Sequence, residues 1–355
     1  FHGFNAGIYV TGNGASARTF TVCGSRFLNN EKGIYAVNAG YATIIQSEFA
    51  IGSKSRNNYG SYLDRVTNFC IEENSFTSAK KTNSYGVAVV NSGSYNDIYR
   101  NTFSNLHYAN IAIGFNISSS GPTLGLTYTC NTNSGNTNDF FVDRYNGQGY
   151  ICDAQGSPSM AAANTFTATS YHFYNRGNSV VKYYYKGANS RPTRTYNVTS
   201  MVASSDNECE SHYDVVIGGG GVVMSVGKTD SLKNKYESTL TSYNRLNGLS
   251  TLKIEKDSMQ RVQQESQLSM LQRECQLATG DIVRSNLNKE ARDFKELREW
   301  LGKSNDISSA RMIIASYIQQ KDFVNAIALA KTLPATYDLQ GEELNEFYDY
   351  LEIIR

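Results

Sequence analysis

The sequence predicts a mainly β fold, a parallel β-helix with a β-rich cap, followed by an α-helical C-terminal domain. A short motif that ends in Phe recurs with steps of 22, 27 and 27 residues, at Phe27, Phe49, Phe76 and Phe103. Composition also changes along the chain: residues 1–228 carry 25 of the 29 Gly and 19 of the 25 Tyr, but only 29 of the 65 charged residues. Self-similarity at a period of about 20 to 50 residues indicates a solenoid, in which each repeat forms one coil.

The segments between these motifs have the composition of strands. They are short, rich in β-branched and aromatic residues, and bracketed by Gly, Asn and Ser, as in residues 33–40 and 86–93. Two or three such strands per coil, with no proline before Pro122, favour a parallel β-helix. A leucine-rich repeat would need a Leu-spaced consensus, which is absent.

Superposing the coils at period 27 places residues of one kind in shared columns. The apolar columns are Phe49, Phe76 and Phe103, and Ile44, Ile71 and Ile98; a polar column is Gln46, Glu73 and Arg100. Strand alternation directs the apolar columns inward and the polar column to solvent. Each buried Phe should contribute about 1.5 to 3 kcal/mol. We expect the Asn before Phe, at Asn74 and Asn101, at a coil corner, where its amide bonds the backbone and a left-handed conformation is tolerated.

Four regions follow from these patterns. Residues 1–166 are expected to form the coils and residues 167–216 a β-rich cap that covers the last coil, with residues 171–187 as a β-hairpin. The glycine run at residues 217–228 is interpreted as a linker rather than a phosphate-binding loop, because it lacks the Lys-Ser/Thr of that motif. Residues 229–355 are expected to be helical.

Helical periodicity marks the C-terminal region. Residues 258–275 and 290–303 read as amphipathic helices, and the second contains Trp300, the only Trp. Further on, residues 323–334 and 341–354 predict an αα-hairpin, with Phe323, Ile327 and Ala330 on one face and a stop at Pro334; Leu344, Phe347 and Leu351 share a face of its second helix. Most simply, the charged faces of these helices are solvated.

Charge and hydropathy limit the partners. The net charge is +1 and no long Lys/Arg block occurs, so a nucleic-acid partner is not expected. No apolar run reaches the roughly 18 residues that span a bilayer, so no transmembrane segment is expected. The chain begins at Phe1 rather than Met, which suggests an interior piece of a longer protein.

The six cysteines form no metal-binding pattern. We expect Cys23 and Cys70 to be buried thiols, because each lies among strand-like apolar residues. Cys130 and Cys152, which are close in sequence, are the candidate disulfide pair; their Cα atoms would have to lie within about 7 Å of each other.

No catalytic, cofactor-binding or metal-binding residue is predicted. Polysaccharide lyases on this fold need a carboxylate cluster and a base, but the columns place Asp64 beside Asn91, Glu73 beside Arg100 and Cys70 beside Asp97. Glu73 with Arg100 reads as a surface ion pair. Neighbouring Glu72 and Glu73 point to opposite faces of a strand, so they cannot flank a glycosidic bond. The four His are scattered.

Tyr183 and Tyr185 are the candidate glycan contacts. They alternate with Tyr184 in "VVKYYYKG" and therefore share a strand face, and an aromatic face can stack on a sugar ring. The competing interpretation is a cap hairpin that packs Tyr184 inward.

Three segments carry a resemblance to a known family. The coil "GSYLDRVTNFCIEENSF", residues 155–187 and the tail "DFVNAIALAKTLPATYDLQGEELNEFYDYLEII" resemble the large secreted right-handed β-helix proteins of the Bacteroidota that are cargo of the type IX secretion system. The resemblance implies a right-handed β-helix, no cofactor, a secreted or cell-surface location, and the type IX translocon and its outer-membrane shuttle as partners. The sorting domain of that family would lie beyond Arg355. Ser231 and Ser258, each in an Asp-Ser-apolar triplet, resemble O-glycosylation sites of such exported proteins.

Three functional hypotheses follow. The first is a structural or adhesin-like surface protein that has no catalytic activity in this segment and that contacts surface glycans. The second is a polysaccharide lyase or glycoside hydrolase whose catalytic coils lie before Phe1. The third is that the helical tail docks the protein to the translocon or its shuttle.

Overall fold

The computed structural model describes residues 1–12, 19–52, 56–93, 95–118, 121–213, 226–251, 258–287, 293–304 and 306–337, with Leu339, Leu344, Tyr348 and Leu351. These residues fall into two compact units, one up to Ser211 and the other from His212 on. Most of the predicted Gly-rich linker, residues 217–225, lies outside the described residues.

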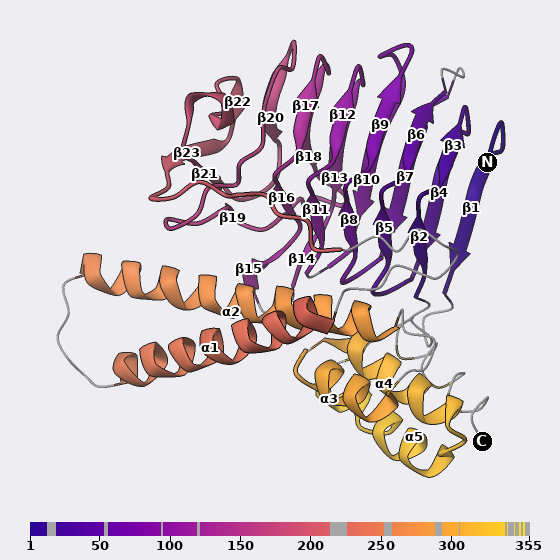
Figure 1. Ribbon diagram of the computed structural model, residues 1–355, viewed down its shortest axis with the longest axis vertical. Coiled ribbons are helices and arrows are strands. Elements are labelled where there is room, and N and C mark those ends of the chain that lie inside the picture. The colour runs from indigo at the N-terminus through magenta and orange to yellow at the C-terminus, as the bar shows by residue number, and fades with distance from the viewer. Residues whose placement is uncertain are drawn as a thin grey trace. The chain divides into compact units, whose positions relative to one another are not determined.

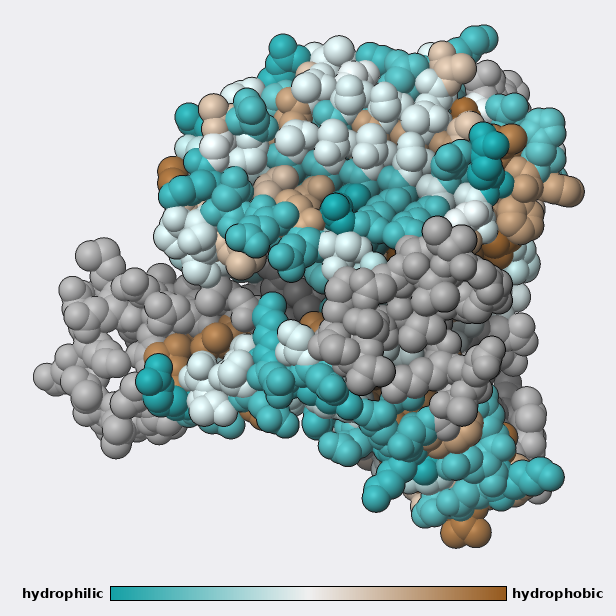
Figure 2. Space-filling model, in the orientation of Figure 1, coloured by the Kyte–Doolittle hydropathy of each residue, from teal (hydrophilic) through white to brown (hydrophobic). Residues whose placement is uncertain are grey.

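The first unit is a solenoid of parallel sheets, as predicted (Figure 1). Sheet I has the order β1 (Ala6–Thr11), β4 (Lys32–Val37), β7 (Asn58–Asp64), β10 (Ser84–Val90), β13 (Tyr108–Ile113), β18 (Asn138–Asp143), β20 (Tyr171–Asn175), β22 (Thr195–Tyr196). Sheet II comprises β2 (Thr21–Cys23), β5 (Thr43–Ile45), β8 (Cys70–Glu72), β11 (Asp97–Tyr99) and β16 (Thr127–Thr129). Sheet III comprises β3 (Arg26–Leu28), β6 (Glu48–Ile51), β9 (Ser75–Ser78), β12 (Thr102–Ser104) and β17 (Thr132–Ser134). Figure 2 shows this coil stack covered mainly by hydrophilic and near-neutral residues on the side in view.

Smaller elements complete the first unit. The parallel strands β19 (Ala154–Gln155), β21 (Val181–Tyr185) and β23 (Val198–Val202) form one further sheet. The strands β14 (Ile117–Ser118) and β15 (Gly121–Gly125) pair antiparallel, and a 3₁₀ turn covers Ala188–Ser190.

The predicted Phe column forms the core. Phe49, Phe76 and Phe103 are in register in sheet III, and each ring is at most 1% exposed. Centroids of successive rings, from Phe1 through Phe27 to Phe103, lie 4.5 to 4.9 Å apart, with planes within 9° of parallel. The Ile column is confirmed in sheet II as well.

A column of glycines in sheet I leaves room for these rings. A Cβ at Gly60 would lie 2.5 Å from the Phe76 ring and 2.7 Å from the carbonyl oxygen of Gly86. Gly86 meets Phe103 in the same way, at 2.8 Å. These glycines therefore serve close packing between coils.

The predicted corner Asn residues form a buried amide ladder. The backbone N–H groups of Asn74, Asn101 and Asn131 donate to the side-chain oxygen of the Asn one coil further on, at 2.9, 3.0 and 2.9 Å, and Asn164 ends this series. The ladder terminates on Tyr183, whose hydroxyl accepts from Nδ2 of Asn164 at 3.1 Å.

The prediction that the corner Asn takes up a left-handed backbone conformation is wrong. The residue before each Asn has that conformation instead. The backbone φ is positive at Glu73 (56°), Arg100 (56°), Cys130 (60°) and Ala163 (54°). At the surface of the same corner, Gln46 and Arg100 both contact Glu73, so the predicted polar column and ion pair are present.

Residues 171–185 are not a hairpin. β20 pairs parallel with β18 and β22 in sheet I, whereas β21 pairs parallel with β19 and β23. Phe173 and Tyr183 are fully buried in the same core as the Phe column. The predicted cap at residues 167–216 therefore begins with further coils, because its aromatic residues continue the interior packing.

Two further register predictions need correction. Asp64 lies opposite Val90 rather than Asn91. The coil after Phe103 is longer than 27 residues, because the partner of Phe103 on the next coil is Asn133. Cys70 does lie opposite Asp97.

The second unit is helical, as predicted. Its helices are α1 (Val226–Thr251), α2 (Ser258–Leu287), α3 (Phe294–Gly302), α4 (Ile307–Gln319), α5 (Phe323–Ala330) and α6 (Leu333–Thr336). Asp293, Asp306 and Asp322 each precede a helix and accept from its first backbone N–H groups, which fixes where α3, α4 and α5 begin. Trp300 is buried edge-on against Tyr236 at 5.2 Å.

The predicted face of α5 is partly wrong. Ala326 and Ala330 are fully buried, whereas Phe323 is 46% exposed. Pro334 does not end this helix, which stops at Ala330; it lies in the first turn of α6, where a missing N–H costs nothing. Of the expected last helix only Leu344, Tyr348 and Leu351 are described, and Phe347 lies outside the described residues. Leu351 and Leu344 pack in the α4–α6 core.

Candidate functional site

Sheet I carries a row of aromatic rings on its outward face. Strand alternation buries Ile34 and Ala36, so Tyr35 between them points outward, and the other strands repeat this pattern. We call this row the tyrosine ladder: Tyr9, Tyr35, Tyr62, Tyr59, Tyr85, Tyr108, Phe141, Tyr174 and Tyr196.

The ladder is continuous from β1 to β22. Centroids of consecutive rings lie 4.9 to 5.4 Å apart throughout. It changes column between Tyr62 and Tyr59, because the first column continues with Ala88 and Ile111, which carry no ring. Tyr171 adds a ring beside Tyr174 at 4.4 Å.

The outer rings are packed differently from the inner ones. Core Phe planes lie within 9° of each other, but successive ladder rings are tilted by 21° to 79°. Tyr9 is 61% and Tyr196 54% exposed, and the tyrosines between them are half-buried. Tilted, half-buried rings leave part of each face open to solvent, whereas the parallel Phe rings cover each other.

Burial raises the pKa of the hydroxyls at four ladder positions, Tyr59, Tyr62, Tyr85 and Tyr108. Desolvation, followed by the Asp64 carboxylate and neighbouring tyrosines, raises the pKa of Tyr62 to about 12. Desolvation and the flanking Tyr59 and Tyr108 raise the pKa of Tyr85 to about 12 as well. Within the described part of the chain, the hydroxyls of Tyr35, Tyr62 and Tyr85 bond no other protein group, so they can donate to and accept from a ligand.

The charged side chains bordering the ladder are paired. The pairs are Lys32 with Glu31 at 3.4 Å, Arg65 with Asp64 at 3.4 Å, and Arg176 with Asp143 at 3.5 Å. Lys32 also lies 5.1 Å from the centroid of the Tyr35 ring. Each of these three cations is thus matched by a neighbouring carboxylate.

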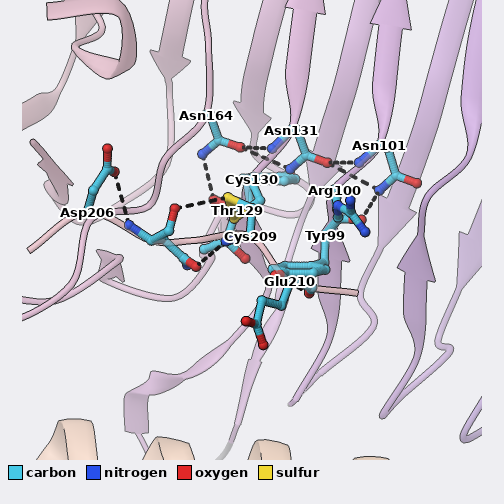
Figure 3. The surroundings of a disulfide bond; sticks show 12 residues. Tyr99, Arg100, Asn101, Thr129, Cys130, Asn131, Asn164, Asp206, Cys209 and Glu210 are labelled. Carbon is cyan, nitrogen blue, oxygen red and sulfur yellow. Dashed lines mark hydrogen bonds between the residues drawn. A yellow bond between two sulfur atoms is a disulfide. The ribbon is translucent and has the colours of Figure 1, made fainter. Parts of the chain in front are cut away.

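A return segment, residues 203–210, runs back along the coils after β23. Its backbone bonds that of residues 158–161, and it ends where Cys209 forms a disulfide with Cys130 (Figure 3). The next residue, Glu210, accepts from the Tyr99 hydroxyl at 2.7 Å, one coil further back. With Thr165 and Ser190 the segment also lines a pocket of about 380 Å³.

The disulfide corrects the predicted pairing. Cys130 joins Cys209, with Cα atoms 5.6 Å apart and a sequence separation of 79, and not Cys152. Cys152 is buried with its thiol 3.2 Å from the carbonyl oxygen of Ala154. Cys70 is a buried thiol, as predicted, and Cys23 is a half-buried thiol whose pKa is raised by burial.

The predicted glycan contact at Tyr183 is wrong. Its side chain is fully buried, and its hydroxyl accepts hydrogen bonds from Asn164 at the end of the buried amide ladder. Tyr185 shares its strand face, is half-buried at the edge of the core, and has the Arg191 guanidinium 5.4 Å above its ring. Tyr184 packs on the opposite face with Ala161 and Ala203.

The two expected O-glycosylation sites lie in the helical unit. Ser231 is an exposed residue of α1, and Ser258 is the first residue of α2, while Asp257 before it lies outside the described residues.

No metal-type cluster occurs in the part of the chain that the structure describes: no three His, Cys, Asp or Glu side chains gather there. Glu73 pairs with Arg100 at a coil corner and also accepts a hydrogen bond from Gln46. In the same described ranges, no helix has the length and apolar character needed to cross a bilayer.

The coil stack defines the chain as a parallel β-helix protein. A family model described as "Periplasmic copper-binding protein (NosD)" matches residues 1–136. The match ends just after β17, the strand in which Asn133 replaces Phe in the core column. No curated protein and no solved structure matches the chain.

The tyrosine ladder had a signal in the sequence. Gly-x-Tyr occurs at Gly7, Gly33 and Gly60, at the spacing of the coils. The Gly makes room for a core Phe, and the Tyr two residues later must then point outward. Counting Tyr along this column would have located the first three rings.

Proposed function

We propose that this chain belongs to an exported, non-catalytic β-helix protein that acts outside the cytoplasm as a structural or adhesin-like element. The observation that carries the proposal is the disulfide between Cys130 and Cys209. Disulfides of this structural kind form and persist in oxidising compartments, outside the cytosol. The periplasmic description of the family that matches residues 1–136 supports the same location.

The copper in that description is not part of the proposal, because the donors do not fit. Residues 1–136 contain no Met and only His2 and His107 as histidines. Of the three cysteines there, Cys130 is in the disulfide, and Cys23 and Cys70 lie on strands that are not neighbours in sheet II. Copper sites draw on clustered thiolate, thioether and imidazole ligands.

The type IX route extends the proposal, and it rests on the resemblance to Bacteroidota cargo proteins. A tagged full-length protein should appear outside the cells of a type IX-secreting bacterium and stay inside a translocon-deficient strain. Equal export by both strains would contradict the route, and retention in the cytoplasm of both would contradict the proposed location.

The absence of catalysis is tested separately. The protein from the wild-type strain should release no reducing ends or unsaturated products from polyuronates and algal or plant glycans. Product formation would replace this proposal with the lyase or hydrolase hypothesis.

Docking of the helical unit is a further proposal. If residues 229–355 contact the translocon or its shuttle, their deletion should abolish co-purification with those proteins. Co-purification that survives the deletion would refute docking through the helices.

A further inference from the structure

We propose that the tyrosine ladder binds a linear, uncharged polysaccharide along the axis of the solenoid. This inference deepens the proposed function and rests on it, since it names the ligand class of the exported protein. It assigns the binding role to the outward face of sheet I and not to Tyr183 or Tyr185.

The length of the ladder selects a polymer. Its rings lie on eight strands, from β1 to β22, which leaves seven spacings between neighbouring strands. At about 4.8 Å per spacing, the ladder is about 34 Å long. A small molecule would cover only one or two rings, whereas an extended chain can contact all of them.

The chemistry of the tyrosine rings indicates a sugar as the ligand. Tyr presents an apolar ring with a hydroxyl at its tip, and a pyranose presents an apolar C–H face bordered by hydroxyls. The tilt of 21° to 79° between neighbours leaves part of each ring face open, and the hydroxyls of Tyr35, Tyr62 and Tyr85 have no protein partner within the described residues. Phe141, the one ring without a hydroxyl, is also the most buried, at 8% exposed.

Packing alone does not explain this choice of residue. The core column uses Phe at successive positions and stacks it within 9°. A purely structural outer row could use the same residue and the same parallel stack. The outer row instead keeps hydroxyls at eight of its nine positions and keeps its rings tilted.

The charge of the border selects an uncharged chain. Lys32, Arg65 and Arg176 each neutralise a neighbouring carboxylate, and Asp64 and Asp143 lie on the same outward face. An anionic polymer would need cations that are not already paired, and it would meet these carboxylates. A neutral chain pays no such electrostatic cost.

The experiment is native affinity electrophoresis of the full chain in gels that contain one polysaccharide. The neutral probes are hydroxyethylcellulose, galactomannan and dextran, and the anionic probe is polygalacturonate. Retardation is expected with at least one neutral probe and not with polygalacturonate. No retardation by any neutral probe, or stronger retardation by polygalacturonate, would overturn the inference.

Ladder variants then locate the site. Tyr9→Ala combined with Tyr196→Ala removes the two most exposed rings, so folding should be retained, and it should weaken binding about tenfold. Tyr62→Ala, at the change of column, should weaken it similarly, with far-UV circular dichroism confirming the fold. Tyr348→Ala is the matched control, because this side chain is also 54% exposed but lies in the helical unit. Equal binding by all four proteins would place the ligand elsewhere.

The outcome also separates this inference from the proposed function. Binding followed by shortening of the polysaccharide would contradict the non-catalytic role and leave the ladder assignment standing. Export without polysaccharide binding would support the proposed location and refute the inference that the tyrosine ladder binds a polysaccharide.

Discussion

Asp139 is a carboxyl group inside the β-helix, and its removal should stabilise the protein at neutral and alkaline pH. It lies on β18 with no exposed surface. Its Oδ1 accepts from Nδ2 of Asn136 at 3.0 Å, whereas Oδ2 has no partner within the described residues. Flanking register pairs place it opposite Ala109, in the column that earlier coils fill with Gly86 and Gly60.

Burial raises the pKa of Asp139 from 3.8 to about 7, although the hydrogen bonds from Asn136 and from the Ala168 backbone act to lower it. The folded pKa of Asp139 lies above the unfolded one. Below about pH 4 the carboxyl is protonated in both states, so it costs the folded protein nothing. As the pH rises from about 4 to about 7 the free energy of unfolding decreases, and above about pH 7 it stays at the lower value. A rise from 3.8 to about 7 corresponds to a cost of about 4 kcal/mol at pH 8.

Asp139→Asn keeps the shape and removes the charge. At pH 8 the free energy of unfolding should increase by up to about 4 kcal/mol, and at pH 4 it should change by less than about 1 kcal/mol. Urea denaturation followed by near-UV circular dichroism at pH 4, 6 and 8 measures both. His172, on the neighbouring strand, has a pKa lowered by burial and by Arg194, but it is present in both proteins and cancels in the difference.

Asp206→Asn is the control, since Asp206 is an exposed carboxylate of the same unit. It should show the same pH dependence as the wild type. If Asp139→Asn also followed the wild type from pH 4 to pH 8, the carboxyl would be ionised at no cost and the reasoning would be refuted.

Two further substitutions test the packing of the coils by the same urea assay. Gly60→Ala places a methyl group 2.5 Å from the Phe76 ring and should lower the free energy of unfolding by about 1 to 3 kcal/mol. Gly187→Ala is the control and should be close to neutral, because a Cβ there would have no atom within 4 Å. Equal effects of the two substitutions would argue against the close approach of coils. Asn101→Ala leaves buried backbone groups of two neighbouring coils without partners and should cost about 3 kcal/mol, against less than about 0.5 kcal/mol for the exposed Thr102→Ala beside it. A loss below about 1 kcal/mol for Asn101→Ala would contradict the amide ladder.

The coils up to Phe103 could be predicted because their interior residues recur at short, nearly constant steps. Interior Phe recurs at steps of 22, 27 and 27 residues and Ile at steps of 27, and strand alternation then fixes which side chains face inward. Beyond that point the Asn ladder steps by 30 and 33 residues, and Asn133 takes the place of a Phe. A fixed period cannot follow coils of changing length. Residues 171–185 therefore could not be assigned to coils from the sequence, and their pattern resembled a hairpin.

The disulfide and the burial of Tyr183 depend on contacts between segments that are distant in sequence. Cys130 and Cys209 meet only because the return segment runs back across the coils, a path with no periodic signal in the sequence. Proximity in sequence favoured Cys152 instead. Strand alternation predicts that Tyr183 and Tyr185 share a face, but whether that face lies inside or outside depends on how β21 pairs with β19 and β23.

Non-reducing peptide mapping of protein recovered from outside the cytoplasm, unfolded in iodoacetamide, tests the central claim most directly. The account predicts one cross-linked pair of peptides that carries Cys130 and Cys209, with Cys152 alkylated. A link between Cys130 and Cys152, or alkylation of both Cys130 and Cys209, would contradict the return segment and remove the main support for an exported protein.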